Sequence, residues 1–216
     1  ELALSSFGEF RLFTVQPLSK SQAFKIIRNY DSINESSFAE SLISEIKQNT
    51  SQVNEFLTNP FLVSLLYKSY TFNRDIPTKK STFYEEVYLC LYKHHDLSKD
   101  GFRRQKRSNL DIQDFRIILR YIAFDSAKAG RLTFSDVELA ELIRKSKEKS
   151  LITYFKEADY IDDLLNTVPI FQKDGTKSKW AHKSIQDYFA AEYIVFHSKK
   201  DDIMNKIFQS QKDAYL

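Results

Sequence analysis

Apolar residues recur every three or four positions along most of the chain, a spacing that predicts a succession of amphipathic helices. Ser19 with Gln22 has the form of a capping box, so the first helix is expected to begin there. Ser37 with Glu40 has the same form and predicts the start of a second helix. The apolar face of that second helix repeats at four-residue spacing, at Phe38, Leu42 and Ile46.

The middle of the chain predicts two further helices and then a break. Asn59 can accept amide protons of a first turn, and Pro60 lacks an amide proton and has its φ already set, so a helix is expected over residues 60–73. Another helix is expected from about residue 82 to 95. From 98 to 110 the apolar periodicity is lost and basic residues gather, which indicates a linker between two helical units.

The second half of the chain predicts three more helices. Asp111 can cap the first of them, and Gly130 is expected to end it. Ser135 with Glu138 is a capping box for the second, and the third covers about residues 154–166.

Two short strands are expected on either side of Asp174-Gly175, a pair favoured in tight hairpin turns, and helix resumes after His182. Helix, helix, helix, β-hairpin and helix is the order of a winged-helix domain with an added C-terminal helix. The scarcity of chain-breaking residues, four glycines and four prolines, also favours helices. The expected fold is mainly α: a helical domain followed by a winged-helix domain with a small β-hairpin wing.

Residues 10–15, Phe-Arg-Leu-Phe-Thr-Val, are aromatic and β-branched and predict one strand before Pro17. A single strand needs a sheet, so we expect the chain to begin at the edge of a domain whose remainder is absent. The predicted organisation is a remnant of that domain at 1–17, a helical domain at 18–97, a basic linker at 98–110, a winged-helix domain at 111–198 and the start of a following segment at 199–216.

Charge and cysteine content change this picture little. Thirty-two Lys and Arg against 29 Asp and Glu give a net charge of +3, which is too mild to indicate a nucleic-acid partner. The single cysteine, Cys90, cannot form an internal disulfide and favours a reducing compartment. No run of about 18 apolar residues occurs, so no membrane partner is expected. The expected localisation is cytoplasmic.

The composition excludes several classes of catalytic site. The four glycines lie too far apart for a Walker A loop, a dinucleotide fingerprint or a nucleophile elbow. The four histidines form no His-Glu-x-x-His pair, and one cysteine excludes a Cys-x-x-Cys site, so no metal site is expected. Paired carboxylates brought together by the fold stay open, although Glu85-Glu86 and Asp162-Asp163 are more typical of a solvated helix surface. We expect no catalysis by this chain.

Two segments resemble a known family. Leu57-Thr-Asn-Pro-Phe-Leu-Val-Ser-Leu-Leu66, followed by Ile76-Pro-Thr-Lys-Lys-Ser-Thr-Phe-Tyr-Glu-Glu-Val87, is similar to the helical segment after the nucleotide-binding core of NACHT-type signal-transduction NTPases, of the STAND class. Trp180-Ala-His-Lys-Ser-Ile-Gln-Asp-Tyr-Phe-Ala-Ala-Glu-Tyr-Ile194 resembles the segment at the end of that family's winged helix. Phe10 to Ser19 also resembles the last core strand and its exit. The resemblance extends from about residue 7 to residue 198.

In that family the helical domain and the winged helix fold back over ADP bound to an ATPase core. The resemblance implies that this chain is a regulatory part, which helps to hold a parent protein closed and opens on a signal, in antiphage or innate-immune defence. The P-loop, Walker B and sensor segments do not occur here, so ADP or ATP with Mg is expected only in the parent and no cofactor is expected for this chain alone. The implied partners are the missing nucleotide-binding core and the sensor domain.

Two residues are candidates for contact with the nucleotide, by resemblance and only with the core present. His182 precedes a helix, whose N-terminus suits an anion, and the family's histidine meets the phosphate from this position. Pro60 corresponds to the proline that lies against the adenine. A structural histidine and a simple helix start are the open alternatives.

The rival prediction is a winged-helix module that binds nucleic acid or another protein. Its third helix, residues 154–166, is acidic and would be repelled by phosphates, whereas the wing lysines could touch a backbone. We therefore expect at most weak, salt-sensitive binding to DNA. An apolar surface made for the missing core could also drive self-association.

Overall fold

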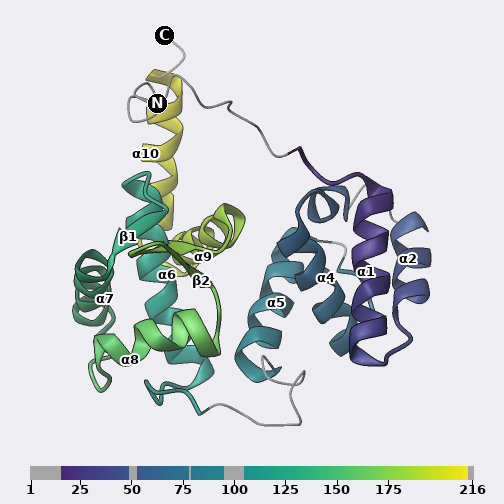
Figure 1. Ribbon diagram of the computed structural model, residues 1–216. Helices are drawn as coiled ribbons and strands as arrows, with labels where there is room; N and C mark the ends of the chain where they lie inside the picture. The colour runs from purple at the N-terminus through teal and green to yellow at the C-terminus, as the bar shows by residue number, and fades with distance from the viewer. Residues whose placement is uncertain (1–15, 49–52, 78, 95–104, 214–216) are drawn as a thin grey trace, which may run out of the picture. The chain divides into compact units, whose positions relative to one another are not determined.

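The computed structural model describes four stretches of the chain, residues 16–48, 53–77, 79–94 and 105–213. They form two compact units, one ending at Lys79 and the other beginning at Lys80. Figure 1 shows that both units are built mainly of helices, with one small sheet in the second unit. The predicted strand at 10–15 and most of the predicted remnant at 1–17 lie outside the described residues.

The first unit contains, in chain order, α1 (Lys20–Asn34), α2 (Ala39–Gln48), the short 3₁₀ helix η1 (Asn54–Thr58) and α4 (Pro60–Asn73). The Ser19–Gln22 capping box is formed at the start of α1, as predicted. Asn59 caps α4 by accepting a hydrogen bond from the Phe61 amide at 2.8 Å, with Pro60 in the first helical position. These starts were predictable because a cap joins residues only two or three positions apart.

The core of the first unit lies where α1 packs on α2 and α4. The apolar spacing of α2 was predicted correctly in part, because Leu42 and Ile46 are both buried whereas Phe38 lies just before the helix and is half-buried. Burial of such side chains is the main source of helix stability in a domain of this size. The fully buried apolar side chains include Ala23, Ile27, Leu42, Ile43, Ile46, Val53 and Val63.

The start of α2 differs from the prediction of a Ser37–Glu40 capping box. The amides of Phe38 and Ala39 donate to the carboxylate of Asp31, on α1, at 3.1 and 2.6 Å. The carboxylate of Glu40 instead accepts a hydrogen bond from Arg28 Nε at 2.7 Å. A residue of the preceding helix therefore does the capping, because the short turn brings its carboxylate to the free amides of α2.

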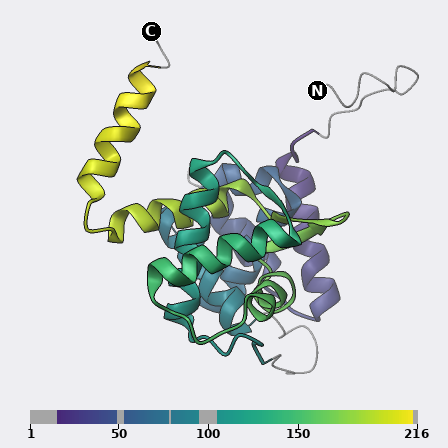
Figure 2. The ribbon, with the colours of Figure 1, turned by 90° about the vertical axis from the view of Figure 1, so that its left-hand side faces the viewer.

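The second unit follows the order α5 (Lys80–His94), α6 (Ile112–Lys128), β1 (Thr133–Ser135), α7 (Asp136–Ser150), α8 (Glu157–Asp162), the π-helical turn η2 (Asp163–Thr167), β2 (Phe171–Asp174), β3 (Lys177–Trp180), α9 (Lys183–Phe196) and α10 (Lys200–Asp213). Its core lies where α6 packs on α9 and α7. Figure 2 shows that α10 extends away from the other helices of this unit and is joined to them at the end of α9.

The predicted caps of this unit are confirmed. Asp111 accepts hydrogen bonds from the Gln113 and Asp114 amides at 2.7 and 2.9 Å. Ser135 and Glu138 form the capping box of α7. Gly130 follows the end of α6 at φ +63°, in the left-handed region where a residue without Cβ costs least.

The sheet has one more strand than predicted. β2 and β3 form the expected antiparallel hairpin, with Phe171 opposite Trp180 and Gly175 at φ +61° in the turn. β1 pairs with the other edge of β3, so that the strand order is β1-β3-β2. β1 has only three residues, which is too short to give an alternating pattern that the sequence could reveal.

Helix, strand, two helices and a two-stranded wing are the elements of a winged helix, here α6 to β3, with α9 as the added C-terminal helix. The predicted class, mainly α with a small β wing, is confirmed. The third predicted helix, over 154–166, is realised as α8 continuing into η2.

The two units divide earlier in the chain than the predicted linker at 98–110. α5, which the prediction assigned to a helical domain ending at 97, belongs to the same unit as the winged helix. Residues 95–104 lie outside the described residues, but 105–110 are fastened to the unit. The buried carboxylate of Asp163 accepts hydrogen bonds from the amides of Arg107 and Ser108, both at 2.9 Å, and from the Ser108 hydroxyl at 2.6 Å.

Candidate functional site

His182 is the second of the two residues between the wing and α9. β3 ends at Trp180, α9 begins at Lys183, and His182 has the extended backbone of an N-cap, with φ −154° and ψ 143°. Its Nδ1 accepts a hydrogen bond from the Ser184 amide at 3.2 Å and lies 2.6 Å from the Ser184 hydroxyl. The half-buried imidazole therefore occupies the place that a serine or aspartate side chain usually takes.

This hydrogen bond fixes the protonation of the ring. Because an amide N–H donates to Nδ1, that nitrogen carries no proton, so the neutral imidazole has its proton on Nε2. Burial lowers the pKa of His182, against an opposing effect of the Asp187 carboxylate, which favours this neutral form. Among the described residues no acceptor is paired with Nε2, so a donor is available beside the N-terminus of α9.

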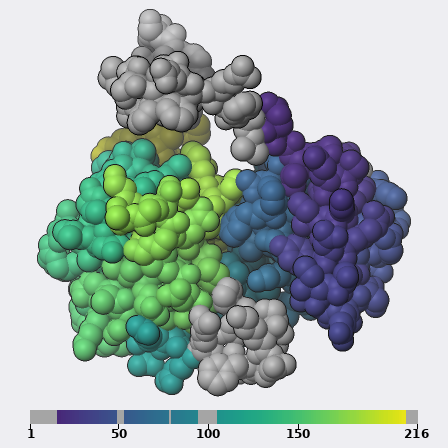
Figure 3. Space-filling view, viewed as in Figure 1, coloured from purple at the N-terminus to yellow at the C-terminus, as the bar shows by residue number. Residues whose placement is uncertain are grey.

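The surroundings of His182 combine a helix N-terminus with polar groups of the wing. Lys183 is held by Asp187 one turn along α9, at 2.6 Å. Trp180, two residues before His182, is buried, and its Nε1 has no hydrogen-bond partner. In Figure 3 the light green of the wing and of α9 lies at the surface on one face of the second unit.

Pro60 belongs to the first unit, and His182 to the second. The proline occupies the first position of α4, and it is exposed, as is typical of a helix start. Both candidate residues thus have a complete local structural role, and their contact with a nucleotide stays a prediction.

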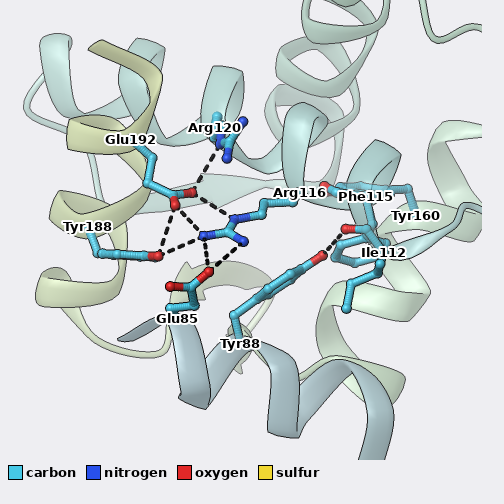
Figure 4. A network of polar contacts seen from close by, with 9 residues as sticks. All are labelled: Glu85, Tyr88, Ile112, Phe115, Arg116, Arg120, Tyr160, Tyr188 and Glu192. Carbon is cyan, nitrogen blue, oxygen red and sulfur yellow. Dashed lines mark hydrogen bonds and ion pairs between the residues drawn. The ribbon is translucent and has the colours of Figure 1, made fainter. Parts of the chain in front are cut away.

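The sequence reasoning missed a buried polar network in the second unit, shown in Figure 4. Arg116, on α6, donates from Nε to Glu192 on α9 at 3.0 Å, and a second nitrogen of the same guanidinium contacts the other oxygen of Glu192. Arg120 donates to Glu192 at 3.0 Å, and the Tyr188 hydroxyl donates to it at 2.9 Å. Glu85, on α5, accepts from Arg116 at 3.3 Å.

The charges in this network stabilise one another. Burial opposes the charge on Arg116, but the hydrogen bond and charge of Glu192 outweigh burial and raise the pKa of Arg116. Burial likewise opposes the charge on Glu192, yet its hydrogen bonds to Arg116 and Arg120 lower its pKa. A sequence signal existed, since Arg116 with Arg120 and Tyr188 with Glu192 are polar pairs at i,i+4 on helices whose other faces are apolar.

The features that could bind a nucleic-acid backbone are largely engaged within the protein. Of the four lysines in the wing and at the start of α9, Lys173, Lys177, Lys179 and Lys183, three have an aspartate partner: Lys173 with Asp136, Lys179 with Asp174 and Lys183 with Asp187. Lys106 lies over the ring of Tyr92 at 3.8 Å, and Arg107 contacts Asp162 at 3.2 Å. The helix α8 carries the acidic Glu157, Asp159 and Asp162.

Across the described residues, no group of three or more His, Cys, Asp or Glu side chains is placed to hold a metal ion. No helix in that part of the chain is both long and apolar enough to cross a membrane. α9 and α10 expose several large apolar side chains: Val195, Phe196, Met204, Ile207 and Phe208.

Comparison with protein-family models and with curated proteins finds no match to this sequence.

Proposed function

We propose that this chain is the regulatory part of a NACHT-type signal-transduction NTPase, which closes over ADP bound to the core of the parent protein and opens when a signal is recognised. The support is the pair of segments that resemble this family, one around Pro60 and one beginning at Trp180, in the family's order. The mainly helical fold with a small wing is of the kind that the resemblance requires.

The observation that carries the proposal is the position and tautomer of His182. A helix N-terminus has a positive dipole and unpaired amides, which favour an anion such as a nucleotide phosphate. The proton of His182 is on Nε2 because Nδ1 is occupied by the Ser184 amide, so the ring can donate to a phosphate without becoming a cation. The half-buried ring is held in place by the cap, which reduces the entropy lost on binding.

In this proposal the chain performs no chemistry. The core of the parent supplies the phosphate loop, binds ADP or ATP with Mg, and hydrolyses ATP, whereas His182 stabilises only the closed, ADP-bound state. Pro60 would lie against the adenine. The biological setting that the resemblance favours is antiphage or innate-immune defence in the cytoplasm.

The test uses the full-length parent with His182→Asn. Asparagine is a good N-cap, so this variant keeps the start of α9 but removes the Nε2 proton. We expect ADP to dissociate about 10- to 150-fold faster, since a hydrogen bond to a charged group is worth about 1.5 to 3 kcal/mol. Partial activation without signal is expected to follow, because the lost contact stabilised only the closed state.

His197→Asn is the matched control. The Nδ1 of His197 also accepts the amide proton of the residue two positions on, Lys199, at 3.0 Å, but His197 lies at the other end of α9. This variant is expected to leave ADP retention unchanged. Unchanged ADP retention in His182→Asn would contradict the proposal and leave His182 as a structural cap alone.

A further inference from the structure

The face of α5 that carries Glu85, Tyr88 and Tyr92 is bound to the winged helix over about two helical turns. The Tyr88 hydroxyl donates to the carbonyl of Ile112 at 2.6 Å, at the start of α6. The Tyr92 hydroxyl donates at 2.6 Å to the carbonyl of Leu110, just before that helix. α5 is thus tied to the backbone of the winged helix and not only to its side chains.

Between these polar contacts the interface is apolar and closely packed. A crevice between α5 and the α9 side of the winged helix has no room for a water molecule. The ring of Tyr88 meets that of Phe189 edge to face, with centroids 5.5 Å apart. Dry, interlocked side chains of this kind resist partial separation, because opening a gap loses many contacts at once. The crevice is lined by Tyr84, Val87, Tyr88, Leu91, Ile170, Ile185, Tyr188 and Phe189.

Arg116 joins α5 to the rest of this interface. Its guanidinium forms a two-pronged contact with Glu192 on α9, and the remaining terminal nitrogen reaches Glu85 on α5 at 3.3 Å. Figure 4 shows the side chain lying between the two helices, with Tyr88 alongside. The side chains of Arg116 and Glu192 are 10% and 12% exposed, so water screens this pair little, whereas Glu85 is about half exposed.

We infer that α5 moves with the winged helix as one body, and that Arg116 is the positioning residue that holds it there. α5 is the first element of the second unit. Its hydrogen bonds to the winged helix and the dry interface hold it within that unit. This inference holds whether or not the parent protein binds a nucleotide.

The inference is tested with spin labels on the complete chain. The buried Cys90 is replaced by alanine, and labels are attached to Lys93→Cys on α5 and Val137→Cys on α7, both at exposed positions. Electron–electron double resonance then gives the distribution of distances between the two labels. One narrow distribution is expected, whereas a broad or divided distribution in this background would overturn the inference.

Arg116→Met then tests the role of the arginine. It removes the contact with Glu85 but leaves Glu192 with Arg120 and Tyr188, so the winged helix is expected to stay folded. The distance distribution should broaden, and the amides of α5 should exchange hydrogen at least about tenfold faster. Arg144→Met is the control, because Arg144 also contacts two glutamates but lies exposed on α7. An Arg116→Met variant that behaves like the control would overturn the role of Arg116.

Glu85→Gln keeps the test decisive if Arg116→Met fails to fold. This change weakens only the α5 side of the network, and Glu85 is about half exposed, so folding is not at risk. Exchange at the α5 amides is expected to rise about three- to tenfold while exchange in α6 and α9 stays unchanged. Glu148→Gln, which affects an exposed Arg–Glu pair, is expected to change neither. Equal exchange in Glu85→Gln and Glu148→Gln would count against Arg116 as the residue that holds α5.

Discussion

His182 and His197 show how the same side chain serves opposite ends of one helix. Each accepts, at Nδ1, the amide proton of the residue two positions later. At the N-terminus of α9 a protonated imidazole would lose this hydrogen bond and face the positive end of the helix dipole. The hydrogen bond at Nδ1 and the helix dipole therefore both favour the neutral form of His182.

The capping role of His182 gives a stability prediction for the chain. His182→Ala should lower the free energy of unfolding by about 1 kcal/mol, because an amide of the first turn loses its acceptor. His182→Asn should retain most of that stability. Urea unfolding monitored by circular dichroism measures both, and an unchanged free energy of unfolding in His182→Ala would show that the cap contributes nothing.

The lowered pKa of His182 predicts a pH dependence with a definite sign. In the unfolded chain histidine binds a proton at about pH 6.5, and in the folded chain only at lower pH. The unfolded state therefore binds more protons in this range, and stability falls as the pH drops from about 7 through the folded pKa. The stability of the wild-type chain relative to His182→Asn should fall over this range. A difference between the two that is constant with pH would refute this.

At the scale of elements, a few carboxylates decide how neighbouring segments join. Asp31 binds the turn before α2 and also accepts a hydrogen bond from the Tyr67 hydroxyl on α4, at 2.6 Å, so one side chain links three helices. Burial opposes its charge, but these hydrogen bonds together lower its pKa. Asp163 likewise joins two segments, because it accepts hydrogen bonds from the Arg107 and Ser108 amides just before α6.

Asp163 and its neighbour Asp162 form a natural pair for mutation. In Asp163→Asn an amide group replaces one of the two buried oxygens and cannot accept from the Arg107 or Ser108 amides, so a loss of about 2 to 3 kcal/mol is expected. Asp162→Asn weakens a largely exposed contact with Arg107 and should cost less than about 0.5 kcal/mol. Thermal or urea unfolding compares the two, and similar losses would mean that residues 105–110 are not anchored by Asp163.

The whole chain has a small positive net charge, and lysines of the wing are paired with aspartates of the same chain. Such pairs on an exposed surface add little stability, but they reduce the positive potential that a phosphate backbone would meet. The acidic α8 lies where a winged helix would present its recognition helix. This charge distribution does not favour readout of DNA.

We therefore predict weak, sequence-independent binding to duplex DNA, with a Kd of about 10⁻⁴ to 10⁻⁶ M near physiological salt and a strong decrease as salt rises. Lys177, on the wing, has no ion-pair partner among the described residues, so Lys177→Ala should weaken binding more than Lys173→Ala, whose lysine is held by Asp136. Fluorescence anisotropy with two unrelated duplexes is the measurement. Submicromolar binding to one duplex only would favour the nucleic-acid alternative.

The sequence by itself determined most of the helices, four of their starts and the hairpin turn. Ser19, Asn59, Asp111 and Ser135 were recognisable as caps, and Asp174-Gly175 as a turn, because each acts on residues within three positions of itself. The same local character made His182 identifiable as a residue before a helix. Its nitrogen tautomer required the position of the Ser184 amide.

Only the tertiary structure decided how these elements are assembled. Arg116 meets Glu192 across 76 positions, and Asp163 meets Ser108 across 55. Polar pairs at i,i+4 mark the helix faces that carry Arg116 and Glu192, but the sequence does not indicate that these two residues are partners. The sequence also could not assign α5 to the winged-helix unit. An apolar face indicates that a helix packs against something, but it does not indicate which partner it packs against. Local hydrogen bonding is encoded in neighbouring residues, whereas the choice of partner depends on all the surfaces that the folded chain brings together.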